Sequence, residues 1–140
     1  MFKNKYFRIL LIIIIVTANI GCDQVSKKMV RENVSPGKPA IELIDDKFLL
    51  MNVENTGAFL SAFKDLPIFW KNIVLIYLPS LMLIWGLGYT FFHKEMSKMG
   101  LVGLCFILGG GIGNMIDRIK FGSVTDFFLI DLGGIFCPIP

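Results

Sequence analysis

The sequence predicts an all-α polytopic membrane protein with three transmembrane helices and a small β-element in its outer loop. Hydrophobic residues make up 54% of the 140 residues, and the mean hydropathy of +0.67 is too high for an ordinary soluble domain. Long runs carry no charged residue, and two short segments rich in Lys and Arg, 1–8 and 93–98, lie beside them. Residues 1–140 are expected to form a single membrane domain.

We predict the first helix at about 8–29. Its uncharged run of 14 residues ends at Cys22 and would span only about 21 Å, short of a hydrocarbon core of about 30 Å. A membrane helix must therefore continue past Asp23 and Lys27, which are spaced i, i+4 and can pair. The alternative is a lipoprotein signal peptide cut at Gly21–Cys22. Asn19 stands where that signal normally has leucine, which disfavours the alternative.

The second and third helices are predicted at about 70–92 and 98–117. They contain uncharged runs of 21 and 18 residues, each long enough to cross a membrane. Pro79 lies near the middle of the first run and is expected to kink its helix. The positive-inside rule places 1–8 and 93–98 in the cytoplasm, so the first helix runs outward.

Two segments are expected on the outer face, the loop at about 30–69 and the segment 118–140. From Asp23 to Lys71 the sequence has seven basic and seven acidic residues, so this part has no positive bias, as expected of an exported segment. Ala40 to Ile44 and Phe48 to Val53 are predicted as two short strands around Asp45–Asp46.

Four polar clusters fall at the outer end of the helices in this topology. They are D-Q-V-S-K at 23–27, N-T-G-A-F at 55–59, G-N-M-I-D-R at 113–118 and V-T-D-F at 124–127. The first three also have purely structural interpretations. Asp23 and Lys27 could be an ion pair that ends a helix, and Asn55 to Gly57 could be only a turn. At the third cluster, Gly109 and Gly113 could allow close helix packing, and Asp117 and Arg118 could be a pair at a helix end.

Carboxylates are the best candidates for chemistry in these clusters. His93 is the only histidine and the three cysteines are far apart, so neither a metal nor another cofactor is predicted. The net charge of +3 is small and scattered, and no nucleic-acid partner is predicted. Asp126 lies beside Phe127 and Phe128, where an acid is costly unless it is paired or functional. Two close carboxylates cannot easily both ionise, so one can act as an acid while the other activates water.

The four clusters, in this order, resemble the motifs D-Q-x-[ST]-K, N-x-G-A-F, G-N-x-x-D-R and V-x-D-F of the bacterial lipoprotein signal peptidases, or type II signal peptidases. The resemblance covers Asp23 to about Phe136. It implies a four-helix aspartic endopeptidase of the bacterial inner membrane, with a cytoplasmic N-terminus and an outward-facing active site. The family removes the signal peptide of diacylglyceryl-modified prolipoproteins just before the lipidated cysteine, so the implied partners are these prolipoproteins and membrane lipid.

By the same resemblance, Asp126 is a catalytic acid. The residues that would support the site are Asp23, Lys27, Asn55, Gly57, Asn114, Asp117 and Arg118. The family's second catalytic aspartate belongs to an F-N-x-A-D motif followed by a fourth helix, and the 14 residues after Asp126 contain neither. Asp131 stands in a different motif and is not expected to replace it. The 140-residue polypeptide alone is therefore expected not to cleave prolipoprotein. The alternative is a homologue that binds prolipoprotein without cleaving it.

Overall fold

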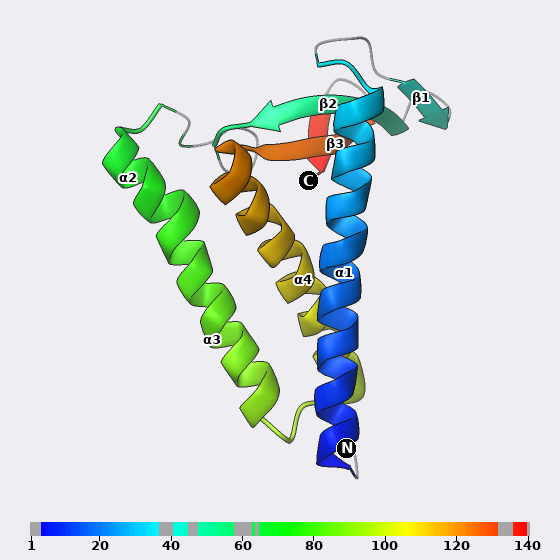
Figure 1. The fold of residues 1–140 in the computed structure, drawn as a ribbon, viewed down its shortest axis with the longest axis vertical. Coiled ribbons are helices and arrows are strands. Elements are labelled where there is room, and N and C mark those ends of the chain that lie inside the picture. The colour runs from blue at the N-terminus through cyan, green and yellow to red at the C-terminus, as the bar shows by residue number, and fades with distance from the viewer. Residues whose placement is uncertain are drawn as a thin grey trace.

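The computed structural model describes residues 4–36, 41–44, 48–57, 63, 65–131 and 136–139. In these ranges, long helices stand together and a four-stranded antiparallel sheet lies across one end of them (Figure 1). We call this end of the molecule the sheet end. Three helical segments are long and apolar enough to cross a membrane, which confirms the predicted fold class.

Helix α1 spans Lys5–Asn33 as one unbroken helix and is longer at both ends than predicted. The Asn4 side chain caps its start, since its Oδ1 accepts the Tyr6 N–H at 2.9 Å. The helix continues through Gly21 and Cys22 without interruption.

The second helical segment has three parts in direct succession. They are α2 at Ile68–Asn72, a π-helical stretch at Ile73–Tyr77 and α3 at Leu78–Phe92. The sequence predicted a kink at Pro79, and the structure has the wider π-helical turn almost directly before it. A proline has no N–H to donate, so the regular helical hydrogen bonds are interrupted at this position.

Helix α4, Lys98–Phe121, packs against both α1 and α3 and lies between them in Figure 1. A Cβ atom on Gly109 would lie 2.5 Å from Cβ of Asn19, and one on Gly113 would overlap the Asp23 carboxylate. These two glycines therefore allow α1 and α4 to approach closely, which confirms the packing role predicted for their spacing.

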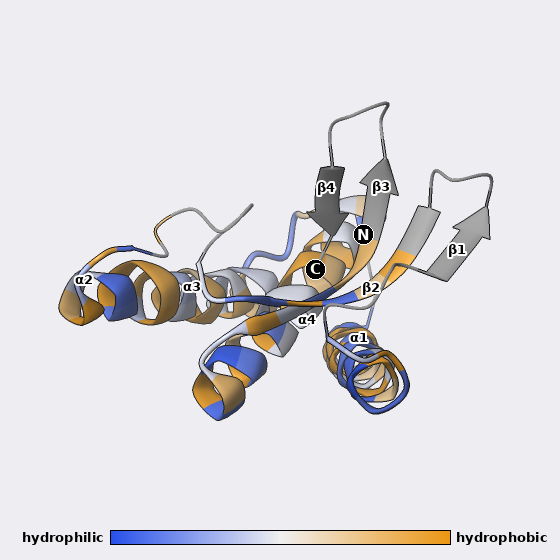
Figure 2. Cartoon of the chain, turned by 90° about the horizontal axis from the view of Figure 1, so that it is seen from above, coloured by the Kyte–Doolittle hydropathy of each residue, from blue (hydrophilic) through white to orange (hydrophobic). Residues whose placement is uncertain are grey.

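The described core lies between α1 and α4, where Ile12 and Val16 meet Leu101 and Cys105. Large apolar side chains elsewhere on the helices are exposed, for example Trp85 at 70%. Figure 2, seen from the sheet end, shows hydrophobic residues along all three helical segments. This distribution is the one expected of helices that face lipid.

At the end of the helices opposite the sheet, Arg8 of α1 binds the end of α3. Its guanidinium group is buried and donates to the carbonyl oxygens of Thr90, at 2.8 Å, and His93, at 2.6 Å. A cation is favourable here because unpaired carbonyls gather at the C-terminal end of a helix. His93 caps α3 and stacks on Tyr89, with ring centroids 4.6 Å apart. It lies at the end of α3 away from the sheet end.

The sheet has the strand order β1-β2-β3-β4, with every neighbouring pair antiparallel. Strands β1, Ile41–Ile44, and β2, Phe48–Asn55, correspond to the two predicted strands. Ala40 and Asp45–Asp46 of that prediction lie outside the described residues. Strands β3, Val124–Asp131, and β4, Phe136–Ile139, were not predicted.

The segment 118–140, predicted only as an outer-face segment after a helix at about 98–117, divides differently in the structure. Helix α4 continues to Phe121, and Gly122 ends it with a left-handed backbone at φ 75°. Strand β3 follows after one residue and pairs with β2. That residues 1–140 form a single domain stays a prediction.

Candidate active site

Lys27 lies at the centre of a buried polar cluster between α1 and α4. Its Nζ is 3.0 Å from Oδ1 of Asp23 and 3.0 Å from Oδ2 of Asp117. It also donates to Oδ1 of Asn114 at 2.7 Å. The Lys27 and Asp117 side chains are fully buried. The predicted pair between Asp23 and Lys27 is confirmed, and we call these four residues the Lys27 cluster.

Two residues of α1 that were not among the predicted site residues complete this cluster: Gln24, which belongs to the D-Q-V-S-K motif, and Arg31, which lies outside the motifs. Gln24 donates to Oδ1 of Asp117 at 3.1 Å and to Oδ2 of Asp23, also at 3.1 Å. Arg31 donates to Oδ1 of Asp117 at 2.9 Å. A signal for both was present, because positions 23, 24, 27 and 31 follow one face of a helix and all are polar.

Arg31 also connects the helices to the sheet. Its Nε donates to Oγ1 of Thr125 at 2.7 Å, and its guanidinium carbon lies 4.1 Å from the centre of the Phe121 ring. Oγ1 of Thr125 in turn donates to Oε1 of Glu54 at 3.1 Å. Thr125 precedes Asp126 in β3, so Arg31 holds the strand that carries the candidate catalytic acid.

Asp126 is buried where β3 pairs with β2. Its partner in the register is Val53, and the side chain of Asn55, two residues further along β2, donates to its Oδ2 at 3.0 Å. Oδ1 of Asn55 accepts the N–H of Gly57 at 3.0 Å, which orients the amide group. The turn predicted at Asn55 to Gly57 therefore has a second role, because it presents Asn55 to Asp126.

The Asp126 carboxyl has an unusual environment for an acid. Burial raises its pKa above the ordinary value, and the Asn55 hydrogen bond and the charges of Lys27 and Arg118 offset this only in part. The negative charge of Glu54 raises the pKa further. Oδ1 of Asp126 is buried and has no hydrogen-bond partner in the part of the chain that the structure describes. An acceptor left in this way is uncommon in proteins.

Arg118 extends from α4 toward the turn. It donates to the carbonyl oxygen of Gly57 at 2.5 Å. Asp117, the preceding residue, forms ion pairs with Lys27 and Arg31. Asp117 and Arg118 thus bind different partners in the structure, whereas the sequence also allowed them to pair with each other. Ala58 and Phe59, which follow Gly57 in the motif, lie outside the described residues.

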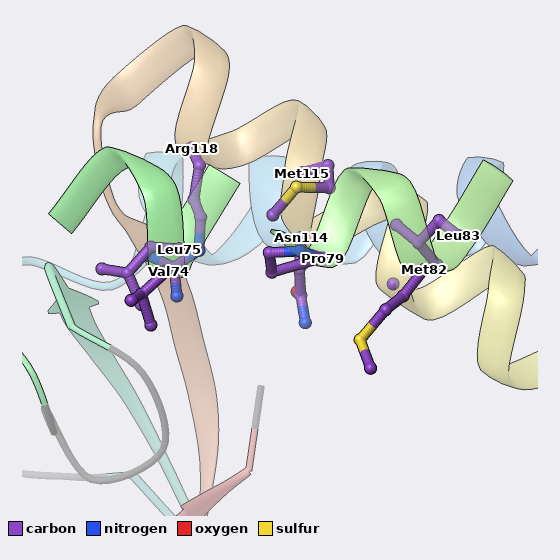
Figure 3. Close-up of a pocket in the computed structure, with 9 residues that line it drawn as sticks. Val74, Leu75, Pro79, Met82, Leu83, Asn114, Met115 and Arg118 are labelled. Atoms are coloured by element: carbon purple, nitrogen blue, oxygen red, sulfur yellow. The ribbon is translucent and has the colours of Figure 1, made fainter. Parts of the chain in front are cut away.

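A pocket of about 400 Å³ opens beside these groups, between α4 and the segment from Val74 to Leu83 (Figure 3). Its walls are mostly apolar, and Asn114 and Arg118 are its polar residues. Asn114 belongs to the Lys27 cluster and Arg118 acts on Asp126. The pocket therefore joins an apolar surface between helices to the buried polar groups at the sheet end.

The geometry can be compared with known proteins. A family model described as "Signal peptidase (SPase) II" matches residues 12–139. The chain belongs to this family. The match confirms the resemblance on which the motif analysis relied, and it covers all four polar clusters.

Named relatives of the signal peptidase II family agree with this assignment. The chain is 36% identical over 118 residues to the "Lipoprotein signal peptidase" of Pelodictyon phaeoclathratiforme, an alignment that covers 84% of this chain and 67% of that protein. It is 35% identical over 115 residues to the protein of the same name from Clostridium tetani, an alignment that covers 82% of this chain and 70% of that protein. The chain thus spans about two thirds of the length of these relatives.

Two solved structures share the fold. Both are described as a "Bacterial membrane enzyme structure by the in meso method". One matches with a TM-score of 0.78 at 22% identity and covers 92% of this chain and 75% of its own. The other matches with a TM-score of 0.76 at 21% identity and covers 91% and 81%. Because the identities are low, these matches support the fold alone.

Proposed function

We propose that this chain supplies one half of the aspartic-type active site of a lipoprotein signal peptidase, with Asp126 as one of the two catalytic carboxyl groups that the reaction needs. The observation that carries the proposal is the buried Oδ1 of Asp126, an acceptor without a hydrogen-bond partner in the described part of the chain. A buried carboxyl with a raised pKa keeps its proton to a higher pH than an exposed aspartate does, which suits general acid–base chemistry.

In this reaction one carboxylate takes a proton from water, and the water oxygen forms a bond to the carbonyl carbon of the scissile peptide. The second carboxyl, still protonated, donates its proton as the carbon–nitrogen bond breaks. Asn55 would hold Oδ2 of Asp126 and leave Oδ1 for water. We propose that the other predicted residues, Asp23, Lys27, Gly57, Asn114, Asp117 and Arg118, support the site.

The second carboxyl has no good candidate among the described acids. Asp117 is committed to Lys27 and Arg31. Glu54 pairs with Thr125 in the register, so it stands on the face of the sheet opposite Asp126. Asp131 is five residues along β3, which separates the two Cα atoms by about 16 Å at roughly 3.3 Å per residue. We therefore propose that the 140-residue polypeptide alone does not cleave its substrate.

The proposed substrate is a prolipoprotein that carries a diacylglyceryl group. Its apolar signal segment would lie along the pocket of Figure 3, and the peptide bond would approach Asp126 from the membrane side. We propose that the protein resides in the bacterial inner membrane with its N-terminus in the cytoplasm and the sheet end outside. The basic segments 1–8 and 93–98 support this orientation.

Cleavage of a lipidated prolipoprotein in liposomes tests the proposal. The 140-residue polypeptide should show no cleavage. Fusion to the F-N-x-A-D segment and following helix of a relative should produce cleavage, and Asp126→Asn should abolish it in the fusion. Cleavage that persists in the Asp126→Asn fusion would refute the role of Asp126. Cleavage by the unfused polypeptide would show that another of its acids supplies the second carboxyl. Binding by the well-folded fusion without turnover would indicate a binding protein instead.

A further inference from the structure

A second, smaller pocket lies at the sheet end, apart from the pocket of Figure 3. It has a volume of about 170 Å³ and lies between the start of the second helical segment and the end of α4. Lys71 and Asn72 contribute to it from α2, Thr56 from the turn directly after β2, and Arg118 from α4. We call it the Lys71 pocket.

Among the described residues that line the Lys71 pocket, the charged ones have one sign. Lys71 and Arg118 are both cationic, and no acidic residue is among the described residues that line it. Thr56 and Asn72 add neutral side chains that can donate hydrogen bonds. Two cations and two neutral donors around a volume of this size suit a compact anion with several acceptor oxygens.

The position of the pocket indicates where this anion comes from. The three residues directly before Lys71 are large and exposed: Ile68 at 79%, Phe69 at 66% and Trp70 at 56%. Exposed aromatic residues at the end of a membrane helix lie at the level of the lipid headgroups. Leu75 and Ile76 line the same pocket one turn further along the helix, on the side where acyl chains begin.

We propose that the Lys71 pocket binds the phosphodiester group of an anionic phospholipid. The phosphate would lie between Lys71 and Arg118, and the acyl chains would follow the apolar helix surface away from the sheet end. This site takes a different ligand from the proposed active site, since a diacylglyceryl-modified peptide has no phosphate. The proposal does not depend on whether the chain cleaves prolipoprotein.

The two sites are connected through one side chain. Arg118 lines both pockets, holds the Gly57 carbonyl at 2.5 Å and acts on Asp126 electrostatically. Figure 3 shows its side chain extending past Leu75, which also lines both pockets. A bound phosphate would therefore share the Arg118 charge with Asp126 and place a lipid beside the proposed substrate path.

Trp70 provides a direct test because it adjoins Lys71. The chain has two tryptophans, so Trp85→Phe leaves Trp70 as the only strong fluorophore. This variant is reconstituted in phosphatidylcholine vesicles that contain a small fraction of brominated lipid, either phosphatidylglycerol or phosphatidylcholine. We expect stronger quenching of Trp70 by brominated phosphatidylglycerol. Loss of one lipid-facing cation should weaken this preference about fivefold in Lys71→Gln, and Lys71→Arg should retain it.

Lys28→Gln is the matched control. Lys28 lies near the sheet end of α1, its side chain is 72% exposed, and its loss removes the same charge from the surface. The preference should persist in this variant, and far-UV circular dichroism should show that every variant keeps its helices. Equal quenching by the two lipids in the parent, or the same loss in Lys28→Gln as in Lys71→Gln, would overturn the proposal. Loss of the preference on adding millimolar inorganic phosphate would assign the pocket to free phosphate instead of lipid.

Discussion

Replacement of Lys27 by methionine tests the central feature of the structure. Lys27 is fully buried, and its ammonium group lies 3.0 Å from each of two carboxylates. Methionine keeps an apolar chain of similar length but removes the charge. Breaking a buried ion pair by removing one partner costs about 3–5 kcal/mol, because the other charge remains buried without compensation. In this variant Asp117 still has Arg31 as a partner at 2.9 Å. We therefore expect the free energy of unfolding to fall by about 3 kcal/mol, the lower end of this range.

The free energy of unfolding can be measured by titrating SDS into detergent micelles and following far-UV circular dichroism. Lys28→Met is the control, since the Lys28 side chain is 72% exposed and its ion pair with Glu32 is 3.8 Å long. It should change stability by less than about 0.5 kcal/mol. The double variant Lys27→Met/Asp117→Asn should recover at least about 1 kcal/mol of the loss, because it also removes the buried carboxylate. A Lys27→Met protein as stable as Lys28→Met would refute the account of the Lys27 cluster.

Three further predictions concern the neighbouring groups. First, folding raises the pKa of Asp126, so ionisation of its carboxyl disfavours the folded state. The free energy of unfolding should therefore fall as the pH rises from the ordinary pKa of an aspartate through the raised pKa of the folded state. Asp126→Asn should therefore be more stable relative to the parent at pH 7 than at pH 4 in the same SDS titration, and an equal difference at both pH values would contradict the raised pKa. Second, Gly113→Ala should lower the free energy of unfolding by about 1–3 kcal/mol, because the added methyl group would be overpacked against Asp23. Gly103→Ala in the same helix should be nearly neutral, since nothing lies within 4 Å of its added Cβ, and similar losses in both would contradict the packing. Third, Arg31→Met removes charged hydrogen bonds, so its free energy of unfolding should be about 1.5–3 kcal/mol lower than that of the parent, and hydrogen exchange in β3 should become faster. Unchanged exchange in β3 would show that Arg31 does not hold this strand.

Several features of the fold could be predicted from local sequence alone. The uncharged runs determined the number of membrane helices, because their lengths are set by the thickness of the bilayer. The i, i+4 spacing of Asp23 and Lys27 was enough to predict their pair, since helix geometry alone brings these positions together. The four motifs were enough to indicate the family, because their order along the chain is far more specific than any one of them.

Strand β3 shows why other features could not be predicted in the same way. Val124–Asp131 contains β-branched and aromatic residues that favour a strand. Its acidic residues and its position after a membrane helix favoured an interpretation as a site of chemistry instead. Its partner, β2, lies before the second helix in the chain, so no local pattern reveals the pairing.

The sequence by itself determined which segments cross the membrane, which residue types are available for chemistry and which family the chain resembles. Only the tertiary structure decided which of those residues meet. Asn55 reaches Asp126 across 71 residues of sequence because β2 and β3 pair in one register. Lys27 reaches Asp117 because Gly113 lets two helices approach closely. The physical reason is that backbone propensity and bilayer thickness act locally along the chain, whereas contacts between distant residues depend on how the formed elements pack.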